Sequence, residues 1–184
     1  MGKGIVEQLK EEFPLEDTWL PFHLRPLTPP QGMPFTELFP GVDMKQRYAT
    51  LNKAGEPYGI HFGERSFLSN SRAALEAGEY AADKGRFHSF HDHVFRAYFT
   101  DLLDIGDMQI LLGLAADVGL DSDDLKHALI TGVYVSRIEQ ALHEASTYGV
   151  SAVPTFIVNE KFRIVGAQPV DSFRERLRLI QGET

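Results

Sequence analysis

The sequence predicts an α/β fold in which a small sheet-containing unit is interrupted by a long all-helical block. Three observations support this prediction. Helical spacing of apolar side chains dominates residues 69–148. Residues 155–158 and 162–165 are short β-branched and aromatic runs separated by Asn159-Glu160-Lys161, which is typical of a hairpin. A helix and a short extended run come before the block, so the predicted order is helix, strand, helical block, strand, strand, helix.

The opening segment is predicted to be an amphipathic helix over residues 4–13. Its apolar side chains recur at helical spacing, at Ile5, Val6, Leu9 and Phe13. Pro14 ends this helix because proline lacks the backbone N–H that the helix needs. Residues 18–24 then predict an extended strand, in which Pro21 favours an edge position or a bulge.

The segment after this strand is rich in proline and glycine. Six of the ten prolines lie between residues 26 and 57. We therefore expect an irregular crossover over residues 28–68, interrupted by one short helix at about residues 43–52. Such connections lie on the surface and often border a binding cleft.

Five helices are expected in the block at residues 69–148, and one more after the hairpin. Asn70 or Ser71 caps the first, an aromatic-rich helix spans about residues 87–99, and Asp107 and Asp121 cap the next two. Gly132 separates the last two helices of the block. Asp171 or Ser172 is expected to cap the final helix. Trp19 and the helix around Phe95 are expected to lie in the core.

Composition excludes several classes of function. The 184 residues suffice for one core with an insertion, and no apolar run approaches the roughly 20 residues that cross a bilayer. The sequence shows no export signal, so a cytoplasmic location is expected. A net charge of -8 argues against a nucleic-acid partner. The chain contains no cysteine, which excludes disulfides, thiolate metal sites and a self-contained dithiol cycle.

Several motifs resemble one known family along nearly the whole chain. They are Glu11-Glu12-Phe13-Pro14-Leu15-Glu16, Trp19-x-Pro21-Phe22-x-Leu24-x-Pro26, Asn70-Ser71-Arg72-x-Ala74-Leu75, the Phe90 to Phe99 helix, and residues 149–168 with Val153-Pro154-Thr155 and Gly166-Ala167-Gln168. In these the chain resembles the DsbA-like branch of the thioredoxin superfamily, particularly its FrnE-like members. The resemblance implies a thioredoxin-like core at residues 1–27 and 149–184, the crossover at 28–68 and an all-helical insertion at 69–148. It also implies that the first strand of the core is missing.

The resemblance further implies where a ligand binds. Val153-Pro154 is expected to form a cis peptide bond that directs the backbone N–H and C=O of Val153 toward the first helix, with an ordinary trans bond as the alternative. A thiol or disulfide peptide, or a glutathione-like ligand, would pair with that backbone. Asn70 and Arg72 are further candidates for contact with an anionic ligand, against the alternative of a helix cap and a solvated charge. No other cofactor is expected.

The family's reactive cysteine would stand at the N-terminus of the first helix, just before Gly2. The helix dipole and free N–H groups lower the pKa of a thiol there. This chain departs from the pattern at that point, so no catalytic residue is assigned and the chain as written should be redox-inactive. We favour a shortened or misassigned start over a natural non-redox relative. Without its first strand the core should close the gap, borrow a strand in a homodimer, or be marginally stable.

Two further functions compete with thiol–disulfide oxidoreduction. One is a glutathione-dependent isomerase or transferase, similar to hydroxychromene-carboxylate isomerases or kappa-class transferases, which would need a serine at the missing position. The other is a non-catalytic binding protein. The histidines His88, His91 and His93 invite a metal site, but they interleave with aromatic residues, and a partly packed helix explains them. No metal site is therefore predicted.

Overall fold

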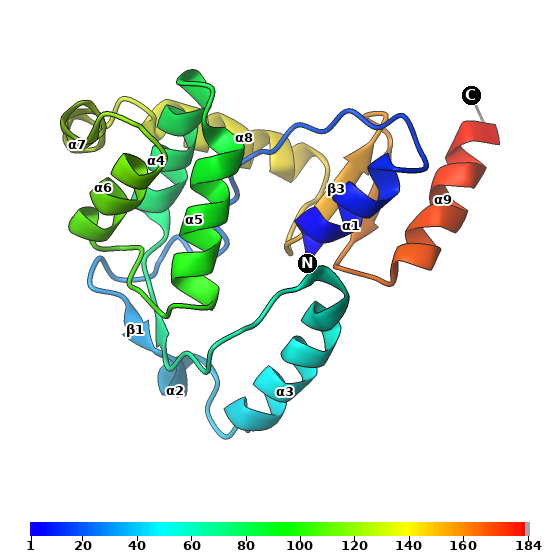
Figure 1. The fold of residues 1–184 in the computed structure, drawn as a ribbon, viewed down its shortest axis with the longest axis horizontal. Coiled ribbons are helices and arrows are strands. Elements are labelled where there is room, and N and C mark those ends of the chain that lie inside the picture. Colours follow the sequence, from blue (N-terminus) through cyan, green and yellow to red (C-terminus); the bar gives the residue numbers. More distant parts are fainter. Residues whose placement is uncertain (183–184) are drawn as a thin grey trace.

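The computed structural model describes residues 1–182, and Figure 1 shows two main groups of elements, with the crossover elements β1, α2 and α3 (residues 33–55) below them. One group is the helical block, and the other combines the first and last helices with a hairpin. The elements are α1 (Gly2–Lys10), β1 (Met33–Pro34), α2 (Phe35–Leu38), α3 (Met44–Gly55), the 3₁₀ turn η1 (Glu56–Tyr58), β2 (Phe67–Leu68), α4 (Arg72–Asp83), α5 (Phe87–Phe99), α6 (Met108–Asp117), α7 (Ser122–Thr131), α8 (Val135–Thr147), β3 (Thr155–Val158), β4 (Phe162–Val165) and α9 (Val170–Gly182).

The helical block forms as predicted and contains the larger core. Asp107 and Asp121 cap α6 and α7 by accepting hydrogen bonds from backbone N–H groups of the first turn. Gly132 ends α7 in the left-handed conformation, with φ of 68°. The core consists of Ala74, Ala77, Tyr80, Ala81, Phe90, Val94, Ile105, Leu111, Ala115, Leu120, Leu125, Ala128 and Tyr134.

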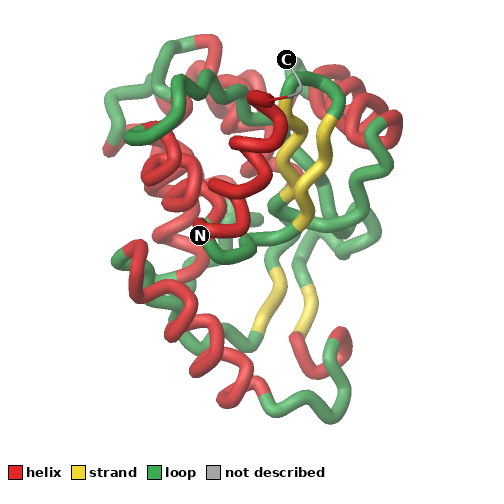
Figure 2. Tube along the Cα trace, turned by 90° about the vertical axis from the view of Figure 1, so that its right-hand side faces the viewer, coloured by secondary structure: helices red, strands yellow, loops and turns green. Residues whose placement is uncertain are grey.

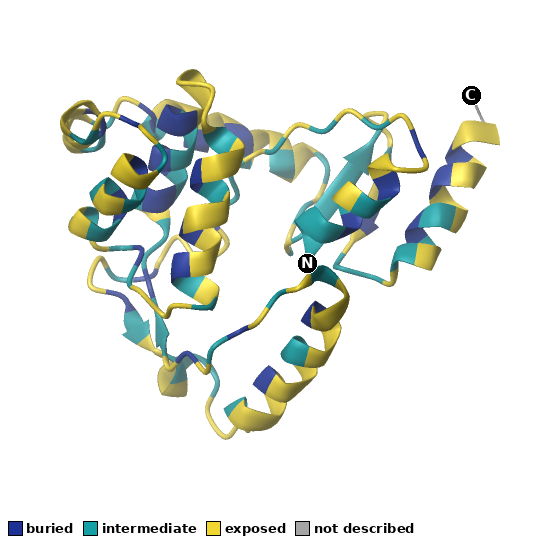
Figure 3. Cartoon of the chain, in the orientation of Figure 1, coloured by how far each residue is buried: buried dark blue, intermediate teal, exposed yellow. Residues whose placement is uncertain are grey.

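The second group packs α1 and α9 against the predicted hairpin. Strands β3 and β4 are antiparallel, with Phe156 opposite Ile164. The ring of Phe156 meets that of Phe173 edge to face at 4.9 Å between centroids. This core is smaller and consists of Ile5, Leu9, Phe13, Ile164, Phe173 and Leu177. In Figure 3 the buried residues of α1 and α9 lie on the sides that face the hairpin.

The crossover is more structured than predicted. Besides α3 it contains α2, η1 and the two-residue strands β1 and β2, which pair with Met33 opposite Leu68. Arg65 anchors this segment, because its buried guanidinium donates to the carbonyls of Phe67 and Tyr98 and lies 4.0 Å over the Tyr98 ring. These elements are too short to show a periodicity in the sequence.

The strand predicted at residues 18–24 is wrong. The segment is extended but joins no ladder, and the described residues contain only the two separate strand pairs seen in Figure 2. An isolated strand gains no backbone hydrogen bonds, so side-chain contacts hold this segment instead.

Three smaller expectations need correction, and the structure decides between the two alternatives of a fourth, the cap of α4. Helix α1 begins at Gly2 and ends at Lys10, and Phe13 is buried beyond it. Helix α9 begins at Val170, so Asp171 and Ser172 lie inside its first turn. Ser71 occupies the cap position of α4 without a side-chain bond, whereas Asn70 Oδ1 accepts from the Arg72 N–H at 3.0 Å. Phe95 is 48% exposed rather than part of the core.

None of the described helices is both long enough and apolar enough to cross a bilayer.

Candidate functional site between α1 and the Pro154 loop

The N-terminus of α1 lies directly against the loop that precedes β3. The Val153–Pro154 peptide bond is cis, as expected. A Cβ placed on Gly2 would lie 3.2 Å from the Pro154 Cβ and 3.5 Å from the ring of Phe156, so the absence of a side chain at Gly2 permits this approach. The Pro154 carbonyl accepts a hydrogen bond from Gly166 N–H at 2.8 Å, which ties the loop to β4. The Val153 side chain is half exposed at the surface of the site.

The crossover closes on α1 at the next turn of the helix. A Cβ on Gly4 would meet the Tyr58 ring at 2.5 Å, closer than two such atoms can approach. Gly4 is therefore required for the contact between α1 and η1. Burial raises the pKa of the Tyr58 hydroxyl. Two glycines in the first turn of α1 thus allow the helix start to be enclosed by both the Pro154 loop and η1.

Electrostatics make this helix end favourable for an anion. Helix α1 has no acidic residue in its first turn and no side-chain cap. Its first N–H groups and the positive end of the helix dipole are therefore not neutralised by a side chain. Burial lowers the pKa of the Met1 amino group, which favours its neutral form. A thiolate or carboxylate beside Pro154 would be stabilised by the free N–H groups and the dipole at the start of α1.

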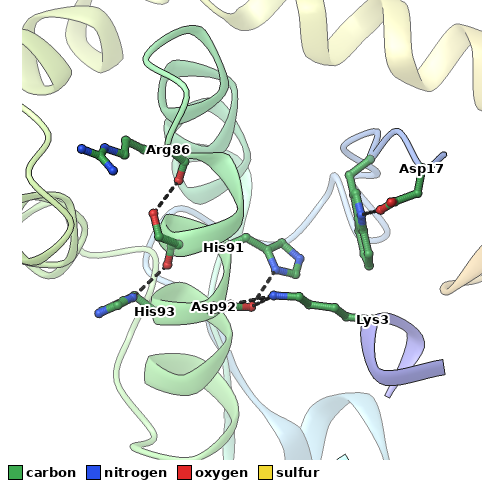
Figure 4. A network of polar contacts seen from close by, with 8 residues as sticks. Lys3, Asp17, Arg86, His91, Asp92 and His93 are labelled. Atoms are coloured by element: carbon green, nitrogen blue, oxygen red, sulfur yellow. Dashed lines mark hydrogen bonds and ion pairs between the residues drawn. The ribbon is translucent and has the colours of Figure 1, made fainter. Parts of the chain in front are cut away.

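Helix α5 faces α1 across the site. Lys3 in the first turn of α1 reaches Asp92 and contacts both carboxylate oxygens at 2.6 Å, as Figure 4 shows. His91 lies beside this pair, with its Nδ1 atom 3.7 Å from Asp92 Oδ1. Because the N-terminus of a helix disfavours a cation, the position of Lys3 is explained by its partner on α5.

A second series of contacts joins the C-terminal end of α1 to His91 of α5. Lys10 forms an ion pair with Asp17, and Asp17 accepts a hydrogen bond from the indole N–H of Trp19. The Trp19 ring then packs on His91 with 5.1 Å between ring centroids. Burial raises the pKa of Asp17, but the hydrogen bonds from Lys10 and Trp19 outweigh that effect and hold it below its usual value.

Asn70 and Arg72 lie at the start of α4, where their described bonds are internal to the fold. Asn70 Nδ2 donates to the Thr28 carbonyl at 2.7 Å and so fastens the crossover to α4. Arg72 pairs with the buried Glu76 at 3.1 Å while its side chain remains 55% exposed. His23 is buried nearby, and burial together with the Arg72 charge lowers its pKa. A ligand contact by Asn70 or Arg72 remains a prediction.

The histidines of α5 do not converge on one point. His93 donates its Nδ1–H to the Ser89 carbonyl at 2.8 Å and points away from His91 in Figure 4. Across residues 1–182, no three histidine or acidic side chains are grouped so that they could hold a metal ion.

Comparison with known proteins identifies the family. The DSBA-like thioredoxin domain matches residues 5–178. This chain belongs to that family. It is also 33% identical over 183 residues to the uncharacterized protein YwbO of Bacillus subtilis strain 168, covering 96% of this chain and 88% of that protein.

Two solved structures share the fold. The probable DsbA oxidoreductase SCO1869 of Streptomyces coelicolor superposes with a TM-score of 0.89 at 24% identity, covering all of this chain and 84% of the other. A putative protein disulfide isomerase of Nitrosomonas europaea gives a TM-score of 0.70 at 15% identity, with 97% and 89% covered. The chain therefore has the DsbA-like thioredoxin fold.

Sequence reasoning missed the residues that join α1 to α5. Lys3, Trp19 and Asp92 are far apart in sequence, and only the fold brings them together. One signal was present, since a lysine in the first turn of a helix opposes the dipole and implies an acidic partner elsewhere.

Proposed function

We propose that this protein acts in thiol–disulfide exchange as a FrnE-like member of the DsbA family, with its site between the N-terminus of α1 and the Pro154 loop. The observation that carries the proposal is the acid-free, uncapped start of α1 against Pro154, in a chain of this family. A helix end of this kind stabilises the thiolate that such exchange requires.

In the proposed reaction, a thiolate at the start of α1 attacks one sulfur of a substrate disulfide. A mixed disulfide forms, the second sulfur leaves as a thiolate, and another thiol then resolves the mixed disulfide. The backbone of Val153, whose side chain is half exposed, would align an extended peptide beside the reacting sulfur. The 184 residues contain no cysteine, so in this proposal the thiols come from residues outside this sequence.

The test is the intact mass and free-thiol count of the native protein purified from its own source. A mass above 20.6 kDa with two titratable thiols would support the proposal. A larger mass without thiols would overturn it in favour of a glutathione-dependent isomerase or transferase. A mass that matches this sequence, with no thiol, would overturn it in favour of a binding protein that holds a thiol or disulfide peptide without turnover.

A further inference from the structure

Both ends of α1 are connected to adjacent residues of α5. Lys3 in the first turn contacts Asp92, and Lys10 at the last turn reaches His91 through Asp17 and Trp19. We call these six residues the α1–α5 joint: Lys3, Lys10, Asp17, Trp19, His91 and Asp92. Because Gly2 of the same helix contacts Pro154, the joint sets where the start of α1 lies relative to the candidate site.

His91 occupies the centre of the joint among aromatic rings. Its ring centroid lies 3.9 Å from that of Phe95 and 5.5 Å from that of Phe87, with Trp19 on another side. Its side chain is only 12% exposed, although it lies between the two halves of the molecule. The imidazole is therefore enclosed only while α1 and the Trp19 segment remain packed against α5.

The charged groups around His91 oppose one another. Burial lowers the pKa of His91, and the charges of Lys3 and His88 lower it further, while Asp92 raises it. A proton on His91 would repel Lys3 and compete with Lys3 for the Asp92 carboxylate. It would also place a charge in a site that is closed to water, which costs free energy.

We propose that His91 makes the α1–α5 joint sensitive to protons, so that protonation of its imidazole loosens α1 from α5 and opens the site at Pro154. When the joint opens, His91 is exposed to water and its pKa returns toward the ordinary value of about 6.5. The open joint therefore binds the proton more tightly than the closed one. By linkage, the closed joint is favoured above this pH and is progressively lost as the pH falls below it. The inference holds whichever reaction the site performs.

Trp19 provides a direct probe because it is the only tryptophan in the chain. Opening separates the Trp19 indole from His91 and exposes it to water, so we expect the Trp19 emission maximum to move to longer wavelength between pH 8 and pH 5, with a midpoint below 6.5 while the circular dichroism stays unchanged. His91→Phe should abolish this transition. The matched control is His93→Gln, on the other side of α5, which should leave the midpoint where it was.

Lys10→Gln gives a second signature that does not depend on whether His91→Phe folds. Removing the Lys10 charge eliminates its ion pair with Asp17 and so weakens the joint, while the Lys3 and Asp92 charges beside His91 stay in place, so the midpoint should move to higher pH. Lys126→Gln on α7 removes the same charge from an exposed site elsewhere and should produce no shift.

Opening itself is measured by amide hydrogen exchange, corrected for the intrinsic effect of pH. From pH 7.5 to pH 5.5, protection in α1 should fall several-fold relative to α7 in the wild type, but not in His91→Phe or, if that variant does not fold, His91→Gln. The proposal is overturned if the emission transition is absent, if it persists without His91, if Lys10→Gln lowers the midpoint, or if α1 protection does not respond to pH.

Discussion

The helical block and the α1–hairpin–α9 unit are held together to different extents. In the described residues the core of the block has thirteen buried members and that of the other unit has six. Helices α6 and α7 have aspartate caps, whereas α1 has none. We therefore expect the helical block to unfold only when the whole chain unfolds. The α1–hairpin–α9 unit, which carries the candidate site, should open locally at a lower free energy. A site that must admit an extended ligand benefits from lying at the edge of the more stable region.

The largest expected effect comes from equivalent truncations in the two cores. Leu125→Ala in the block and Leu177→Ala in α9 both remove a buried leucine and should each cost about 2–5 kcal/mol. We expect Leu125→Ala to lower the free energy of global unfolding, measured by denaturant. Leu177→Ala should mainly lower amide protection in α1, β3, β4 and α9. Equal loss of protection throughout the chain in both variants would show that the two regions unfold as one.

Removal of a cap should have a smaller effect. The Asp121 carboxylate accepts hydrogen bonds from Asp123 N–H at 2.9 Å and Asp124 N–H at 3.0 Å. Asp121→Ala should therefore lower the free energy of unfolding by about 0.5–2 kcal/mol. Asp123→Ala is the control, since its side chain caps nothing in the described contacts. If the two variants are equally stable in a denaturant titration, the cap does not contribute to the stability of the block.

Tyr80 should give a pH-dependent effect of about 1 kcal/mol at neutral pH. Its hydroxyl donates to the Asp121 carbonyl and the Asp124 carboxylate, and burial together with these acids raises its pKa from 10.0 to about 12. A raised pKa contributes stability that is complete below pH 10 and is lost as the pH rises toward 12.

Thermal melts of the wild type and Tyr80→Phe should therefore differ at pH 8 and converge as the pH approaches 12. A difference that stays constant over this range would contradict the assignment of the raised pKa to Tyr80.

The smallest expected effect concerns the surface of the α1–hairpin–α9 unit. Arg174 of α9 pairs with Glu12 at 2.6 Å and with Asp171 at 2.5 Å. Because such pairs are partly exposed, Arg174→Gln should cost at most about 1 kcal/mol, and less in high salt. Arg176→Gln, on the same helix, is the matched control. A larger loss for Arg176→Gln in denaturant melts would contradict this account.

Much of the fold could be predicted because its signals are local. The helices of the block show regular apolar spacing, and Asp107, Asp121 and Gly132 mark their ends, so these boundaries followed from the sequence. The hairpin was equally clear, because two β-branched runs are separated by three residues. Family resemblance, rather than periodicity, indicated the cis bond at Val153–Pro154.

The errors fall where structure depends on distant partners. Residues 18–24 have the composition of a strand, but strand formation requires a neighbouring strand, and none of the described strands lies beside them. Phe95 appeared to be a core residue because helical spacing cannot show whether a second face of a helix is covered. Its ring is 48% exposed and contacts His91 and Phe99 of the same helix. The Lys3–Asp92 contact joins residues 89 positions apart, which no local pattern reveals.

Ligands are proposed to bind between the start of α1 and the Pro154 loop. The most direct test is a backbone NMR titration of the 184-residue chain with oxidised glutathione as the probe. The account predicts that the largest amide shifts fall in residues 2–5 and 153–156, with α6 and α7 unaffected. Shifts centred on the helical block, or no shift at millimolar concentration, would contradict it.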